Sequence, residues 1–199
     1  MIAGGTHEVT GAALNAEIAR VHSANERWWR DLTTGERLQN RNIGELIMLQ
    51  VSELAEAMEG HRKNLPDDKL PHRPMFEVEL ADALIRVLDT AGGTGVSFGD
   101  DWEIQRHPVA GNVGEGLLQI SDLMIRAYGA FMRWDARRGD PEARGAYVSR
   151  TWQVIHGILD FAHFHRVDLW GAYAEKLAYN AVRVDHTDEH RRSEHGKKY

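Results

Sequence analysis

Cysteine is absent from the 199 residues of this sequence. Its absence excludes disulfide bonds, thiolate zinc sites and thiol nucleophiles, and it is typical of proteins from a reducing compartment. No stretch approaches the roughly 18 uncharged apolar residues of a membrane-spanning helix, and Met1 to Gly11 lacks the basic start and apolar core of a signal peptide. We therefore expect a soluble, cytoplasmic protein with no membrane partner.

Basic residues are scarcer than acidic ones, with 24 Lys and Arg against 30 Asp and Glu and a formal net charge of −6. This balance does not suit a surface for non-specific binding of duplex nucleic acid, so we expect no such partner. A nucleotide remains compatible, because a few well-placed cations and metal ions are enough to bind a small anion. The length and a hydrophobic fraction of 42% suffice for one core, so we expect a single domain over residues 1–199.

Strand-like alternation of apolar and polar residues does not extend far enough anywhere to predict a sheet. Helical spacing predicts instead an all-α bundle of about five to six helices. The predicted helices are Ala12 to Leu32, Asn42 to Gly60, a segment between Pro74 and Gly92, Leu117 to Trp134, Tyr147 to Phe164, and Leu169 to Val184. Proline, glycine and charge predict loops at Asn64 to Pro74, Gly92 to Asn112 and Arg137 to Arg144, and a mobile tail over residues 185–199.

Acidic residues occur at a spacing of three on two successive predicted helices, as Glu53 with Glu56 and Glu79 with Asp82. Each residue advances about 100° around an α-helix, so the two members of each pair lie on the same side. Packing of the two helices would gather four carboxylates, which repel one another unless cations neutralise them. Hard oxygen ligands favour Mg²⁺, with Mn²⁺ as a substitute.

The same spacing also has an ordinary explanation. Glutamates three residues apart are common on a solvated helix face, and Arg86 could pair with Glu79 or Asp82. A di-iron carboxylate bundle would gather acidic side chains as well, but it needs a Glu-x-x-His pattern, to which Asp160-x-x-His163 is the nearest approach. The residues by themselves therefore leave both a metal site and a solvated face open.

Three separated motifs point to a family. They are Gly44 to Arg62 (GELIMLQVSELAEAMEGHR), Glu77 to Asp89 (EVELADALIRVLD), and a C-terminal Lys176-x-x-x-Asn180-x-x-Arg183 followed by His195-Gly-Lys197-Lys. In this order they resemble the MazG-like all-α nucleoside triphosphate pyrophosphohydrolases, marked by an ExxE segment, a spacer and an ExxD segment. The resemblance covers about the first 95 residues and the last 30. Gly93 to about Val154 departs from the simple members as a helical insertion. It could replace part of a subunit contact, as in the longer dimeric dUTPase-like relatives, or it could shape the base pocket.

The resemblance implies Mg²⁺-dependent hydrolysis of a (deoxy)nucleoside triphosphate to a monophosphate and pyrophosphate, in nucleotide-pool control or house-cleaning. It implies that Glu53 or Glu56 acts as the base for the attacking water. It implies metal binding by Glu53, Glu56, Glu79 and Asp82, and phosphate binding by Lys176, Asn180, Arg183 and Lys197. Helical bundles of this kind generally need a partner to complete their core, so we expect a homodimer or homotetramer.

Base recognition is expected at the first predicted helix, which offers stacking and hydrogen-bonding groups in His22, Asn25, Trp28 and Trp29. Adjacent tryptophans point in different directions on a helix, so at most one of the two is expected to face the pocket. A different class of function remains open, namely a non-catalytic helical module that binds a nucleotide or a protein and retains the acidic cluster. The preferred base and sugar are not encoded in these residues.

Overall fold

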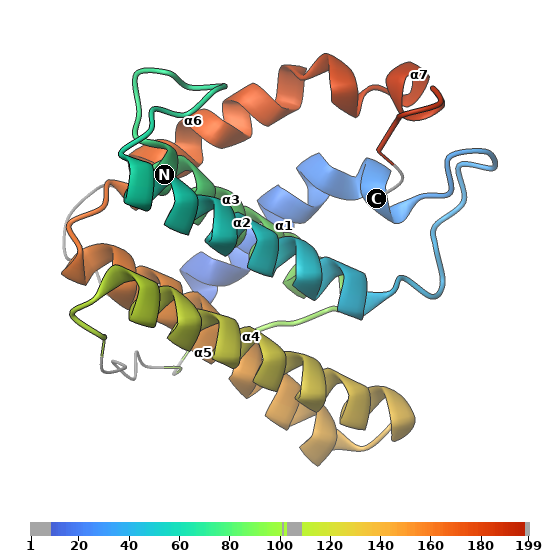
Figure 1. Ribbon diagram of the computed structural model, residues 1–199. Coiled ribbons are helices and arrows are strands. Elements are labelled where there is room, and N and C mark those ends of the chain that lie inside the picture. Colours follow the sequence, from blue (N-terminus) through green and yellow to red (C-terminus); the bar gives the residue numbers. More distant parts are fainter. Residues whose placement is uncertain (1–8, 101, 103–108, 198–199) are drawn as a thin grey trace.

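The computed structural model describes residues 9–100, 102 and 109–197, and they form an all-α fold, as predicted (Figure 1). The longer helices are α1 (Gly11–Asn25), α2 (Ile43–Lys63), α3 (Met75–Gly93), α4 (Val113–Ala136), α5 (Pro141–Phe164) and α6 (Leu169–Val182). The short elements are η1 (Glu26–Trp29), η2 (Val184–His186) and α7 (Asp188–Arg191). Among the described residues, β-pairing is limited to the single bridges Arg30–Arg37 and Pro66–Pro74. None of the helices in this part of the chain has the length and apolar character needed to cross a membrane.

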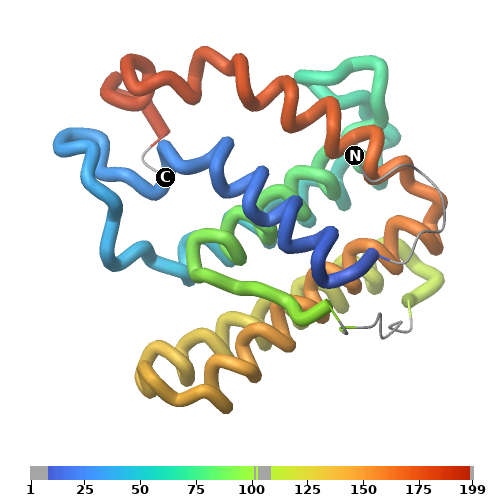
Figure 2. The backbone as a smooth tube through the Cα atoms, turned by 180° about the vertical axis from the view of Figure 1, so that it is seen from behind, coloured from blue at the N-terminus to red at the C-terminus, as the bar shows by residue number. Residues whose placement is uncertain are grey.

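Helix α3 lies at the centre of the bundle, where it contacts α1, α2, α5 and α6. Its residues from Val78 to Ile85 are all buried, and a helix that is buried all round belongs in the interior. Helices α4 and α5 lie side by side at one edge of the molecule and α6 lies at the opposite edge (Figures 1 and 2). This arrangement places α2 and α6 on either side of α3, which carries Glu79 and Asp82.

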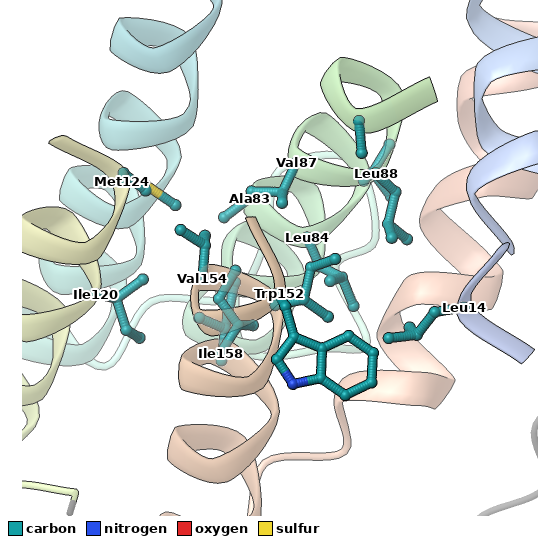
Figure 3. Packing of buried hydrophobic residues seen from close by; sticks show 14 of the residues in the cluster. Leu14, Ala83, Leu84, Val87, Leu88, Ile120, Met124, Trp152, Val154 and Ile158 are labelled. Atoms are coloured by element: carbon teal, nitrogen blue, oxygen red, sulfur yellow. The ribbon is translucent and has the colours of Figure 1, made fainter. Parts of the chain in front are cut away.

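The segment predicted as an insertion shares the core with the rest of the chain. Met124 of α4 and Ile158 of α5 are fully buried and pack in one cluster with Leu84 and Leu88 of α3. Figure 3 shows these side chains meeting, with Trp152 of α5 turned toward the α1 side of the cluster. The α4–α5 pair is therefore part of the same hydrophobic core as the helices that carry the acidic motifs.

The prediction of one helix from Ala12 to Leu32 was wrong. Helix α1 ends at Asn25, a 3₁₀ turn follows, and Arg30 is extended and bridged to Arg37. The turn directs the indole of Trp29 into the core against Gly93, where a side chain at position 93 would clash with the ring. Burial of a large aromatic side chain thus outweighs continuation of the helix.

Two further helix limits differ from the prediction. Gly60 does not end α2, which continues to Lys63 and stops at Asn64 in the left-handed conformation. Gly60 instead allows close packing, because a Cβ there would lie 2.9 Å from the Met75 side chain. Helix α5 begins at Pro141, well before Tyr147, because Asp140 caps its first turn and proline suits the first helical position.

The other predicted segments are close to the structure. In the predicted loop from Gly92 to Asn112, residues 101 and 103–108 lie outside the described residues, and the described part from Thr94 onward is not helical. Helix α6 ends at Val182, with Arg183 as its cap. The tail, predicted to be mobile, is described up to Lys197 and contacts the η1 region: Arg191 donates to the carbonyl of Arg27 at 3.0 Å.

Candidate functional site

Helices α2 and α3 bring three of the four predicted carboxylates together. Glu53, Glu56 and Glu79 each present one carboxylate oxygen, and these oxygens lie within 4.8 Å of one another. Glu53 and Glu79 are buried, whereas Glu56 is exposed. The spacing of three residues turns both glutamates of α2 toward α3, as the sequence predicted. Within the described ranges this is the cluster with the donor set of a metal site.

Asp82 lies beside this cluster and faces α6. Its Oδ2 is 3.0 Å from the Lys176 ammonium, which also lies 4.0 Å from Glu79. Asn180, one turn further along α6, donates to Asp82 Oδ1 at 3.4 Å. Lys176 is only 3% exposed, so its charge serves as the internal counterion of the carboxylates. Its predicted contact with phosphate requires the ammonium to be released from Asp82.

Arg86 has a different partner from the two considered in the sequence. Its Nε donates to Glu53 Oε1 at 2.6 Å, and in the part of the chain that the structure describes no ion pair joins it to Glu79 or Asp82. Glu53 of α2 is therefore bound by a residue of α3 that lies one turn beyond Asp82. The position is not a solvated helix face, because the Glu53 side chain is only 7% exposed.

The crowded carboxylates change the acidity of Glu79 and Glu56. Burial raises the pKa of Glu79 to about 9. The neighbouring Glu53 and Asp82 act in the same direction, whereas the positive charge of Lys176 acts to lower this pKa. Burial and the charge of Glu53 also raise the pKa of Glu56. Burial acts to lower the pKa of Lys176, but Asp82 and Glu79 outweigh it and raise that pKa. The cluster without a metal thus contains more negative charge than Lys176 and Arg86 neutralise, and it holds a proton instead.

The binding of Mg²⁺ or Mn²⁺ is therefore expected to depend on pH. A ligating carboxylate must be ionised, so a metal ion displaces the Glu79 proton, and affinity should rise about tenfold per pH unit between about pH 5 and 9. By the same linkage, the raised pKa makes the metal-free fold less stable as pH rises through this window, because the unfolded chain has by then lost the proton. Calorimetric titration of Mn²⁺ in buffers of different ionisation enthalpy should show about one proton released per ion near neutral pH. Glu79→Gln should abolish the release; a wild-type protein that releases no proton would contradict the assignment.

A cleft beside the cluster gathers predicted residues from both ends of the chain. It is lined by Asn25, Trp28, Asp82, Asn180, Arg183 and Lys197, together with Arg86, Asp89 and His186. Its volume of about 90 Å³ is below the roughly 300–1,000 Å³ of common ligand pockets. The side-chain oxygen of Asn180 is buried and has no hydrogen-bond partner among the described residues. Such an atom calls for a ligand or a water molecule in the cleft.

The two C-terminal cations of the cleft hold an internal anion. Arg183 donates to both carboxylate oxygens of Asp185, at 2.8 and 2.6 Å, and Lys197 lies 2.9 Å from Asp185 Oδ2. These contacts hold the pKa of Asp185 far below its usual range. A carboxylate between an arginine fork and a lysine has the geometry with which these groups bind phosphate. The Asp185 carboxylate thus pairs with the two cations that the resemblance assigns to phosphate binding.

The four residues predicted to bind a base separate into two groups. Asn25 and Trp28 line the cleft, where Arg191 lies over the Trp28 ring at 4.3 Å and His186 packs edge-on against it. Trp29 is buried, in agreement with the expectation that the two indoles point in different directions. His22 and Trp29 instead share Asp89, whose Oδ1 lies 2.9 Å from His22 Nδ1 and from Trp29 Nε1. Neither of them lines the cleft, but both contact Asp89, which does.

Several charged residues of the site were not singled out as binding residues in the sequence, among them Asp89, Asp185 and Arg191. Asp89 lies at the end of the EVELADALIRVLD motif, seven residues or about two helical turns after Asp82, and this periodicity was a usable signal. Asp185 and Arg191 carry no such signal, because their partners are distant in sequence. No family model, no curated protein and no solved structure matched this chain when it was compared with them. The residues of the cluster and the cleft, and their geometry, are therefore the basis for assigning a function.

Proposed function

We propose that this protein hydrolyses a (deoxy)nucleoside triphosphate to a nucleoside monophosphate and pyrophosphate in a Mg²⁺-dependent reaction. The observation that carries the proposal is the position of Asp82. Asp82 lies beside the carboxylate cluster, where its charge acts on Glu56 and Glu79, and it also lines the cleft together with Trp28, Arg183 and Lys197. The carboxylates proposed to bind the metal ion, the cations proposed to bind phosphate and the Trp28 ring thus lie next to one another, which supports a triphosphate as substrate.

The residues present fit a hard divalent cation. Glu53, Glu56 and Glu79 supply oxygen donors from two rigid helices, and the proton held by Glu79 marks a site that lacks positive charge. Asp82 joins this set once Lys176 moves to the phosphates. When bound, Mg²⁺ supplies charge neutralisation of the phosphate oxygens and lowers the pKa of water.

The side chains then have distinct parts in the reaction. Glu56, exposed and with a raised pKa, or the buried Glu53 accepts a proton from the water that attacks the α-phosphorus. The new bond joins the water oxygen to the α-phosphorus, and the bond to the bridging oxygen breaks, so that pyrophosphate leaves. Arg183 and Lys197 exchange the Asp185 carboxylate for pyrophosphate oxygens and stabilise the leaving group.

Trp28 is the surface on which we place the base. Stacking of a base on an aromatic side chain contributes about 1–3 kcal/mol, so Trp28→Ala should raise KM by roughly 5- to 150-fold and change kcat much less. The base replaces the Arg191 guanidinium that lies over the ring. Steady-state kinetics measure the effect, and Trp170→Ala on α6, away from the cleft lining, is the matched control. Equal effects of the two substitutions on KM would remove Trp28 from the binding surface.

The experiment that tests the proposal is a panel of ribo- and deoxyribonucleoside triphosphates with Mg²⁺, scored for monophosphate and pyrophosphate. We expect turnover of at least one member and its loss on addition of EDTA. Nucleotide binding without turnover across the panel would identify a binding module instead. We also propose that the active species is a homodimer or homotetramer, which light scattering measures directly.

A further inference from the structure

Helix α4 has an apolar stripe on its outer side as well as on its buried side. The outer stripe consists of residues spaced by three, four, three and four: Leu118, Ser121, Ile125, Tyr128 and Met132. Leu118 is 70% exposed, Ile125 is 61% exposed and Met132 is 47% exposed. Its inner side, with Ile120 and Met124, is already covered in the core. This spacing is that of a helix packed against another helix, and no helix among the described residues covers Leu118, Ile125 and Met132.

The neighbouring helix α2 extends this stripe into a continuous face. A groove between the two helices is lined by Ile47, Met48, Ser52, Ile125 and Tyr128, and Met48 is 64% exposed. The helices run antiparallel, because Gly44 lies against Tyr128 and Gly114 lies against Met58. Met48 and Ile125 are therefore at the same level. Apolar side chains exposed together on two adjacent helices mark an interaction surface rather than scattered surface residues.

Part of the stripe matches itself when α4 is reversed about Ile125. Under that reversal Leu118 meets Met132 and Ile125 meets its own copy, whereas Ser121 falls at the level of Gly129 and Tyr128 at the level of Asp122. Charges follow the same rule. One flank of the stripe carries Glu115 and Asp122 in its first half and Arg126 and Arg133 in its second half, and Asp122 already pairs with Arg126 at 2.6 Å. A two-fold axis across two antiparallel helices brings the same flank of each together, so each acid of one copy would lie near a base of the other.

We propose that the face formed by the outer sides of α2 and α4 is the contact between two copies of this chain, related by a two-fold axis that passes beside Ile125 and Met48. The pairing of Leu118 with Met132, the position of Ile125 at the axis and the complementary charges of one flank favour a second copy over an unrelated partner. The contact does not depend on the proposed catalytic activity. It does concern the site, because Ser52 lines the groove and Glu56 follows one turn later on α2. The second copy therefore lies beside the exposed member of the carboxylate cluster.

The absence of cysteine from the sequence makes site-specific cross-linking a direct test. Position 125 lies next to the same position of the other copy in the proposed dimer. Mild oxidation of the Ile125→Cys variant should therefore give a disulfide-linked dimer. Leu118→Cys alone should not cross-link, because the two copies of position 118 are separated by about 14 residues, or about 21 Å, along the helices. An equimolar mixture of Leu118→Cys and Met132→Cys should cross-link. Val182→Cys is the control: Val182 lies on α6 and is 77% exposed, and this variant should remain a monomer on denaturing gels.

Sedimentation of the reduced proteins tests the contact without a bond. Ile125→Glu places a charge at the axis in both copies and should weaken the dimer on the order of 100-fold, whereas Val182→Glu should not change its dissociation constant. Circular dichroism verifies that both variants are folded. A wild-type protein that stays monomeric at about 100 µM would overturn the proposal. It would also be overturned by a dimer that Ile125→Glu leaves intact and Ile125→Cys does not cross-link, since another surface would then join the copies. Both results are independent of whether the protein hydrolyses nucleotides.

Discussion

Replacement of Glu53 by glutamine is expected to reduce pyrophosphate release by about 10³-fold or more and to leave the fold intact. A divalent ion contributes several kcal/mol to such a reaction, and each 1.36 kcal/mol is a factor of ten in rate. Glutamine preserves the size of the side chain but removes the charge that a metal ligand or a base requires. The amide oxygen can still accept the hydrogen bond from Arg86 Nε, which is 2.6 Å long in the wild type. Helices α2 and α3 therefore remain joined.

The matched control is Glu59→Gln on the same helix. Glu59 lies beyond the cluster and pairs with Arg62 and Lys63 at the surface, so its substitution should change the rate by no more than about twofold. Rates are compared at saturating Mg²⁺ and substrate, with thermal unfolding as the check on the fold. If Glu53→Gln retained the wild-type rate, the carboxylate cluster would not be the reaction centre. Loss of activity in both variants would point to a general effect of α2 instead.

Replacement of Lys176 by methionine is expected to destabilise the metal-free protein by about 3–5 kcal/mol. The ammonium is 3% exposed and lies 3.0 Å from Asp82 and 4.0 Å from Glu79, so its removal leaves buried carboxylates without their counterion. Methionine has a similar length and an apolar side chain, which keeps the packing around α6. Saturating Mg²⁺ should recover much of the loss, because the ion supplies the missing charge to the same carboxylates.

Urea unfolding with and without Mg²⁺ measures both effects. Lys69→Met is the control, because Lys69 pairs with Asp68 at the surface and should contribute about 1 kcal/mol or less. Mg²⁺ should stabilise Lys176→Met more than it stabilises the wild type. Equal stabilisation of the two proteins, or a metal-free variant as stable as the wild type, would show that Lys176 is not the counterion of the cluster.

Helical periodicity predicted the all-α fold and the positions of α2, α3 and α6 because these helices bury continuous apolar stripes. Prediction was wrong where a local signal had two meanings. Gly60 was taken as a helix end, but it permits the close approach of Met75. Arg137 to Arg144 was taken as a loop, although Asp140 and Pro141 form a helix start within it. The first helix was extended to Leu32, since periodicity does not report that Trp29 has a buried place against Gly93.

The identity of the candidate metal ligands was accessible from sequence, because the spacing of Glu53 with Glu56 is a property of one helix. The choice of ionic partners was not. Arg86 was compatible with Glu79 or Asp82 by spacing along α3, yet it binds Glu53 of α2. Likewise Asp185, which holds Arg183 and Lys197, has no distinguishing feature in a charged tail.

The sequence by itself determined which residues share a helix face, and with it the all-α class and the paired carboxylates on α2 and α3. These are consequences of the fixed rotation per residue of the α-helix, which depends on neighbours in the chain. Only the tertiary structure decided that Lys176 is buried between Asp82 and Glu79, that Asp185 pairs with Arg183 and Lys197, and that Trp28 rather than Trp29 lines the cleft. The strength of a charge pair depends on distance and burial, and both are set by how distant helices pack.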